Sequence, residues 1–216
     1  MSIIKREINL SIHKNKDFIY IMCLFSIMLN FSLFVLDNTN KVESAPILTW
    51  ICTTFALQAS IHNLFFIDYY NGILEQIFIQ SHSSRLVITC KILIHWILFG
   101  LPISFISLIV NIVILESNMQ YSLIMCLSLL FYTLIIISIS AAGYSLTISN
   151  NHLTSGISQI LVLPIIMPTF IYFKFFVEYK FFDFGIISIT LLVSVVLLII
   201  SIFTTHIALK FAIQEN

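Results

Sequence analysis

The stretch Ile92–Leu115 reads ILIHWILFGLPISFISLIVNIVIL and contains no Asp, Glu, Lys or Arg. A hydrocarbon core about 30 Å thick is crossed by about 20 predominantly apolar residues of helix, so this stretch is long enough to span a bilayer. It lacks the alternation of apolar and polar residues that is typical of a transmembrane β-strand. Because a segment in lipid must satisfy its own backbone hydrogen bonds, we expect a transmembrane helix here.

The composition of the whole chain agrees with a membrane protein. Of the 216 residues, 59% are apolar and 9% are charged, whereas soluble domains have about 45–50% and about 25%. Other stretches without Asp, Glu, Lys or Arg give five more expected spans. Two of them come from the longest uncharged stretch, which the polar run Ser149–His152, followed by Gly156, divides. The expected spans cover about residues 18–36, 46–67, 92–115, 121–147, 157–173 and 184–209. The sequence therefore predicts an all-α integral membrane protein with six transmembrane helices in a single domain, residues 1–216.

The distribution of Lys and Arg predicts the orientation, because basic residues near the ends of spans are retained in the cytoplasm. With the N-terminus inside, the inner segments hold seven basic residues and the outer segments three. The inner residues are Lys5, Arg6, Lys14, Lys16, Arg85, Lys91 and Lys210, and the outer ones are Lys41, Lys174 and Lys180. We therefore expect both termini in the cytoplasm. Ile4, Ile8 and Ile12 predict an N-terminal interfacial helix, although residues 1–17 could also be a basic leader that only sets topology.

The chain contains none of the common signatures of nucleotide or metal chemistry. It lacks G-x-x-x-x-G-K-[ST], H-E-x-x-H, C-x-x-C-H and G-x-S-x-G. Cys23, Cys52, Cys90 and Cys126 lie far apart, so we expect neither a disulfide framework nor a structural metal. Ten basic and ten acidic side chains cancel, which argues against binding to nucleic acid. We expect no catalytic residue, no metal and no enzyme activity in this chain.

The segment between the second and third expected spans combines a turn with an amphipathic pattern. Asn71-Gly72 breaks the chain as it leaves the membrane, and Leu74, Ile77 and Phe78 follow at helical spacing with polar residues beside them. We expect a short cytoplasmic coupling helix that a separate motor subunit could grip. The other interpretation is a turn that only covers lipid headgroups.

Several short motifs resemble those of one transporter family. Gly72-Ile73-Leu74-Glu75-Gln76-Ile77 resembles the Gly-x-Leu-Glu-Gln-Leu signature that follows the second span in permeases of the ABC-2 export type. Lys91, the pair His95-Trp96, the triplet Gly100-Leu101-Pro102 and the run ILVLPIIMP at 160–168 follow it. In this order the motifs look like the cytochrome c maturation protein B family, and the similarity covers nearly the whole chain.

That resemblance implies a permease subunit of an ABC transporter complex for cytochrome c biogenesis. ATP hydrolysis on a separate ATPase subunit would be coupled to haem export or to release of a haem-loaded periplasmic chaperone. The implied partners are the ATPase, a second permease copy, a haem-handling membrane protein, the chaperone and membrane lipid. Haem is then a possible substrate, ATP is bound by the partner subunit, and no cofactor is bound stably. The implied location is a bacterial inner membrane or, alternatively, a mitochondrial inner membrane.

The pattern and the resemblance together select two groups of site residues. ATPase coupling is assigned to Asp68, Gly72, Leu74, Glu75, Gln76 and Phe78. A transport or haem-related role is considered for His95, Trp96, Pro102, Pro164 and Pro168.

The histidines and prolines in the second group each allow two interpretations. Ionisable groups in apolar spans are often functional, and neutral His62 or His95 could ligate haem iron or could only form packing hydrogen bonds. Pro164 and Pro168 each remove a backbone donor and weaken the helix, as a hinge or as a shaped packing element. Two other functions also stay open: an ABC-2-type permease that exports another small molecule or a glycan, and a non-transporting membrane scaffold.

Overall fold

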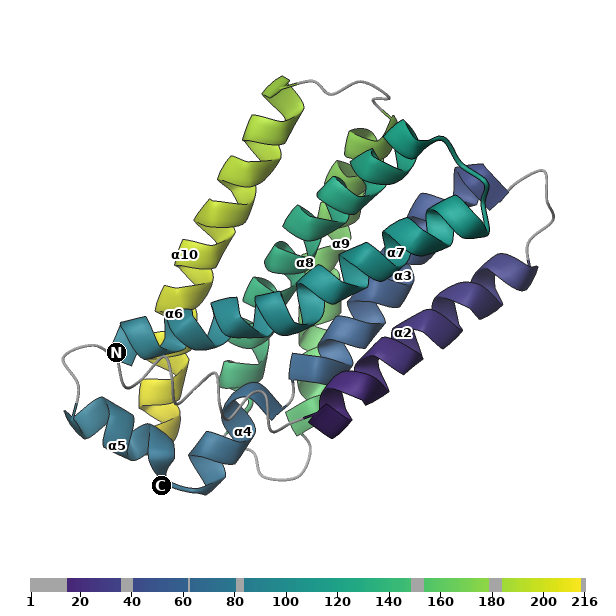
Figure 1. Cartoon of the computed structure of the whole chain (residues 1–216). Coiled ribbons are helices and arrows are strands. Elements are labelled where there is room, and N and C mark those ends of the chain that lie inside the picture. Colours follow the sequence, from purple (N-terminus) through teal and green to yellow (C-terminus); the bar gives the residue numbers. More distant parts are fainter. Residues whose placement is uncertain are drawn as a thin grey trace.

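A computed structural model describes residues 15–35, 41–61, 63–80, 84–148, 154–178 and 184–214. Within these ranges the chain is helical and forms no strand (Figure 1). The elements are α2 (Asn15–Val35), α3 (Lys41–Ile61), α4 (Asn63–Tyr70), α5 (Ile73–Gln80), α6 (Ser84–His95), η1 (Trp96–Gly100), α7 (Leu101–Val113), α8 (Met119–Leu146), α9 (Thr154–Glu178) and α10 (Phe184–Gln214). The all-α prediction is thus confirmed for the described residues. The predicted N-terminal interfacial helix lies mostly outside them, and His62 lies outside them altogether.

Five segments of the described chain are long and apolar enough to cross a membrane. They are Asp17–Phe34, Ser44–Tyr70, Ser84–Val113, Met119–Leu146 and Ile187–Gln214. The fifth predicted span corresponds to α9, in which the apolar segment Ile160–Ile171 is shorter. The prediction of several membrane-spanning helices is confirmed, and the count of six stays a prediction.

The third span begins earlier than the sequence predicts, at Ser84 rather than at residue 92. A search for uncharged residues stops at Lys91, but this side chain is buried within α6. The helix continues through Lys91 because the charge has a partner inside the protein, Asp68 of α4. A charge therefore marks the end of a span only where it faces lipid or water.

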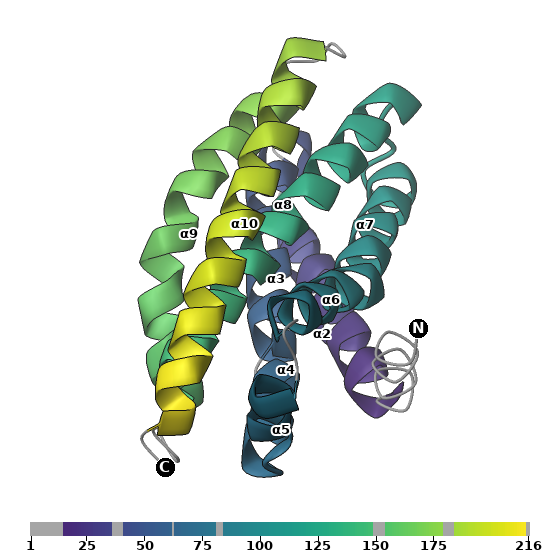
Figure 2. The same cartoon turned by 90° about the vertical axis from the view of Figure 1, so that its left-hand side faces the viewer.

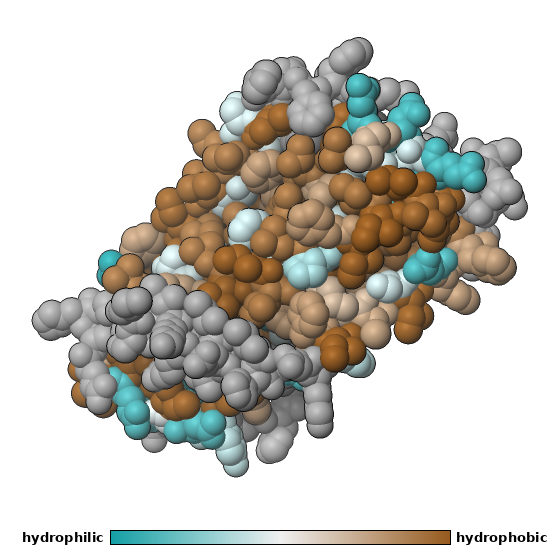
Figure 3. All heavy atoms as spheres, in the orientation of Figure 1, coloured by the Kyte–Doolittle hydropathy of each residue, from teal (hydrophilic) through white to brown (hydrophobic). Residues whose placement is uncertain are grey.

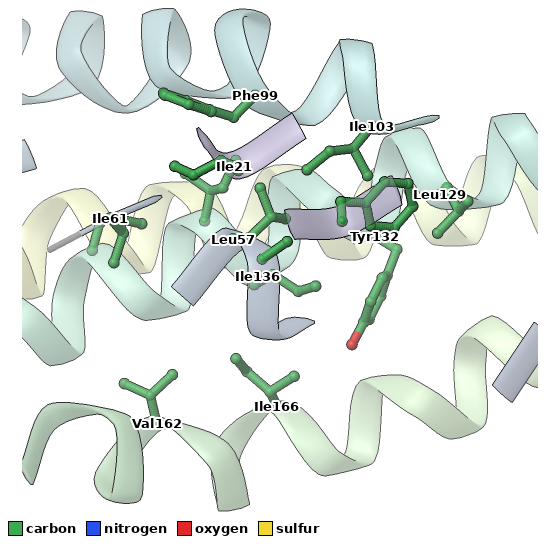
Figure 4. Close-up of a cluster of buried hydrophobic side chains, with 14 of the residues drawn as sticks. Ile21, Leu57, Ile61, Phe99, Ile103, Leu129, Tyr132, Ile136, Val162 and Ile166 are labelled. Atoms are coloured by element: carbon green, nitrogen blue, oxygen red, sulfur yellow. The ribbon is translucent and has the colours of Figure 1, made fainter. Parts of the chain in front are cut away.

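Helix α8 is the centre of the bundle. It packs against α10, α9, α7 and α3, and the two views in Figures 1 and 2 show these helices arranged around it. The interior has an apolar core in which Leu57 and Ile136 are fully buried (Figure 4), and it also encloses polar side chains such as Thr53. Gly143 of α8 allows close approach to α9, because a Cβ atom there would collide with Val162.

The outer surface of the bundle is apolar as well. Side chains such as Phe31 and Phe105 are more than half exposed. The face in Figure 3 carries a broad hydrophobic band between ends where hydrophilic side chains gather. Exposed apolar patches of this extent mark contact with a membrane or with other proteins.

A π-helical turn interrupts the long third span immediately before Pro102. The backbone N–H of Leu101 donates to the carbonyl of Trp96, five residues earlier, instead of four. Proline has no N–H to donate, and its ring collides with the carbonyl four residues before it. The wider turn at η1 accommodates both effects, and turns of this kind are frequent at functional sites.

Candidate functional site

The predicted turn before the coupling helix is present between α4 and α5. Asn71 N–H donates to the carbonyl of Ile67 and Gly72 N–H donates to that of Tyr69, both at 3.1 Å. Gly72 has a φ of +68°, in the left-handed region that glycine adopts without steric cost. This turn reverses the chain at the end of the bundle where α10 also ends (Figure 1). We call residues 63–80, which comprise α4, the turn and α5, the elbow.

Helix α5 has one buried face and one exposed face. Leu74 is only 2% exposed, and Ile77 and Phe78 pack partly buried against the same core. Glu75 and Gln76 are exposed on the other face. A short helix with this pattern is present at Ile73–Gln80, and its place as a cytoplasmic coupling helix stays a prediction. Protein thus covers Leu74 and part of Phe78.

Two large side chains of the elbow are strongly exposed, one at the end of α4 and one on α5. Tyr70 is 81% exposed and Ile79 is 84% exposed. With the exposed Glu75 and Gln76, the elbow therefore presents an acid, an amide, an aromatic ring and an aliphatic group. We call these four residues the α5 surface. Its composition suits contact with another protein, since aromatic and aliphatic anchors ringed by polar groups are typical of interfaces.

Asp68 does not belong to this surface. It is buried at the end of α4, where Lys91 of α6 donates to its Oδ2 atom. The pair connects the elbow to the third span. Asp68 was assigned to ATPase coupling on its position in the sequence, and its burial suits support of the elbow better than contact with a partner.

His95 has partners within the protein. Its Nε2 lies 2.9 Å from the hydroxyl of Ser60 on α3, and its ring centroid lies 4.5 Å from that of Phe99. The side chain is 7% exposed. A ring held in this way fits the packing interpretation better than the interpretation as a haem ligand.

Trp96 is fixed by α8. Its indole Nε1–H donates to the Thr133 hydroxyl at 3.1 Å and approaches the carbonyl of Leu130 at 3.3 Å. Gly100, one turn later, makes room for this arrangement. A Cβ atom there would lie 2.7 Å from Trp96 Cδ1 and 2.9 Å from Thr133 Oγ1.

Pro164 and Pro168 are exposed on α9. The helix runs through both positions without a break. Pro168 lines a groove of about 460 Å³ between α8, α9 and α10.

The described residues contain no group of three His, Cys, Asp or Glu side chains that could hold a metal ion. The four cysteines are free thiols. Sequence reasoning missed one polar cluster, at the C-terminal end of α10, where His206 contacts both α5 and α6. An ionisable side chain inside a predicted span was the signal that selected His62 and His95, and it would have selected His206 too.

Comparison with known proteins identifies the family. The sequence profile of a family described as CcmB protein matches residues 1–214. Heme exporter protein B of Haemophilus influenzae is 29% identical over 177 residues, which are 80% of this chain and 78% of that protein. A protein of the same name from Pseudomonas aeruginosa is 29% identical over 129 residues, 59% of this chain and 56% of that one. With a profile match over nearly its full length and these motifs in order, the chain belongs to the CcmB protein family.

Proposed function

We propose that this chain is the membrane permease subunit of an ABC transporter complex for cytochrome c biogenesis. ATP hydrolysis takes place on a separate ATPase subunit, and this chain couples it to haem export or to release of a haem-loaded periplasmic chaperone. Membership of the CcmB family and the name of the two relatives support haem as the substrate class.

The α5 surface is the observation that carries the coupling role. A permease without a nucleotide-binding loop must receive mechanical work from another protein, at a place where a rigid element is accessible. Helix α5 is fixed on its inner face by Leu74 and presents Glu75 and Ile79 on its outer face. A carboxylate there can accept charge-assisted hydrogen bonds from a partner, and the apolar groups can fill its groove.

The rest of the complex follows from the same family membership. We place the protein in a bacterial inner membrane with both termini in the cytoplasm, so that the α5 surface faces the ATPase. A second permease copy, a haem-handling membrane protein and the periplasmic chaperone complete the proposed assembly.

Charge reversal at Glu75 tests the proposal. The Glu75→Lys protein should be inserted in the membrane at normal abundance. Less ATPase should co-purify with it in mild detergent, and cells that carry it should make less holocytochrome c. A lost charged contact costs about 2–5 kcal/mol when it is buried and less at a rim. Glu116→Lys is the matched control, because Glu116 is also an exposed carboxylate but lies in the α7–α8 loop, at the opposite end of the bundle (Figure 1). Normal ATPase recovery and normal maturation with Glu75→Lys would reject coupling through α5.

A further inference from the structure

His206 of α10 contacts two other elements at once. Its ring centroid lies 5.2 Å from that of Phe78 on α5, within the range of favourable aromatic pairs. Its Nε2 lies 3.0 Å from the hydroxyl of Ser84, the first residue of α6. One side chain thus bridges the coupling helix, the start of the third span and the last helix.

The elbow has a second contact with α10, six residues further along that helix. The Tyr69 hydroxyl donates to the carbonyl of Ala212 at 3.3 Å. Tyr69 lies on α4 and Phe78 on α5, so the two contacts hold the elbow on both sides of its turn. A third contact nearby involves α6, where the guanidinium of Arg85 lies 5.2 Å from the ring centroid of Phe203.

These contacts contrast with the surroundings of the rest of α10. In the most apolar 18-residue part of Ile187–Gln214, 11% of the residues are buried, compared with 67% in the corresponding part of α8. Helix α10 packs mainly on α8, and it barely touches α9. Because much of α10 away from α8 is exposed, the contacts at its C-terminal end are a second place, besides α8, where this helix is held.

We propose that His206 is a positioning residue that holds the coupling helix α5 against α10 and α6. The ring fixes α5 through Phe78 and the imidazole nitrogen fixes α6 through Ser84. A displacement of α5 then moves the C-terminal end of α10 as well as the adjacent spans. The source of that displacement, an ATPase on the α5 surface, rests on the proposed function, but the contact itself does not.

Hydrogen exchange in the full chain, reconstituted in lipid nanodiscs without any partner, tests the positioning role. His206→Ala should accelerate amide exchange in residues 73–80 by about fivefold, because losing one contact shifts local opening by about that factor. Exchange in α8 should not change. Ile207→Ala is the matched control, since Ile207 is the next residue on α10 and is 52% exposed.

Conservative variants separate the two contacts. His206→Phe keeps a ring against Phe78 and should retain slow exchange in α5, while Ser84→Ala removes only the hydroxyl and should accelerate exchange at the start of α6. Phe78→Ala approaches the same contact from α5 and should reproduce the effect of His206→Ala. Unchanged exchange in residues 73–80 in both Phe78→Ala and His206→Ala would overturn the proposal.

A functional measurement distinguishes positioning from general support of the fold. In the assembled complex, the ATPase should co-purify with the His206→Ala protein in normal amount. The yield of holocytochrome c per ATP hydrolysed should be lower in His206→Ala, and His206→Phe should retain most of the normal yield. Equal loss with both variants would count against positioning by the ring. If Glu75→Lys behaves as wild type while His206→Ala still loosens α5, the ATPase site is wrong and the positioning role stands.

Discussion

Lys91 of α6 and Asp68 of α4 form an ion pair in which both side chains are nearly buried, at 8% and 11% exposed. The two residues are 23 positions apart in the sequence, on either side of α5. A buried charge without its partner is strongly unfavourable, whereas replacing both members of a pair by apolar groups is often tolerated.

The Asp68–Lys91 pair predicts an asymmetry between single and double variants. Lys91→Met should lower the free energy of unfolding by about 3–5 kcal/mol, because it leaves the Asp68 carboxylate buried and unpaired. The double variant Asp68→Leu with Lys91→Met should recover most of that loss. Denaturant unfolding in detergent micelles measures both values. Equal losses in the single and double variants would contradict this account.

The turn at Gly72 predicts a backbone effect without a steric one. A Cβ atom at this position would meet nothing within 4 Å, but φ is +68°. Gly72→Ala should therefore destabilise the elbow by about 1 kcal/mol, whereas Gly72→Asn should cost less, because Asn tolerates left-handed φ. Protease resistance of the 63–80 segment reports the difference. If Ala and Asn behave alike, strain in φ is not the cause.

The contact of Gly100 with Trp96 predicts the opposite, a steric effect without a backbone one. A methyl group at Gly100 would displace the indole from Thr133, and overpacking of this kind typically costs about 1–3 kcal/mol. In a Trp50→Phe background, Trp96 becomes the sole tryptophan. Its fluorescence should shift in Gly100→Ala, and thermal unfolding should occur at lower temperature. An unchanged spectrum would show that the π-helical turn can absorb the methyl group.

The arrangement of loops predicts a labelling pattern. Asn71 and Asn118 are both exposed, and they lie at opposite ends of the bundle (Figure 1). In a cysteine-free background, an impermeant thiol reagent applied to intact cells should label Asn118→Cys and should not label Asn71→Cys. Permeabilised cells should show labelling of both. The reverse pattern in intact cells would invert the orientation that the basic residues predict.

The sequence was sufficient for the class of fold and for the turn at Gly72, because both depend on local patterns. Uncharged stretches of span length and the turn residues at Gly72 can both be read from continuous sequence. The structure has helices over those stretches and a turn at Gly72. The start of the third span was predicted less accurately. A search for uncharged stretches stops at Lys91, because the sequence does not show that Lys91 is paired with a residue 23 positions away. Pairing across the fold is a property of tertiary structure.

The same limit applies to the residues around the elbow. Nothing local distinguishes Tyr69, which reaches α10, from Tyr70, which is 81% exposed. His206 carried a visible signal, yet its role depends on Phe78 and Ser84, which the fold brings together. Sequence motifs therefore selected a region for the proposed site, and only the geometry shows which of its side chains face inward.

The central position of α8 has a consequence for biosynthesis. Ser107 and Asn111 of α7 are fully buried, and the polar atoms of their side chains have no hydrogen-bond partner in the described structure. During synthesis α7 leaves the ribosome before α8, and in that interval these groups have only lipid, the translocon or trapped water around them. Because α8 packs against α7, we expect the third span to remain close to the translocon until the fourth is made. The two helices would then enter the bilayer together as a hairpin.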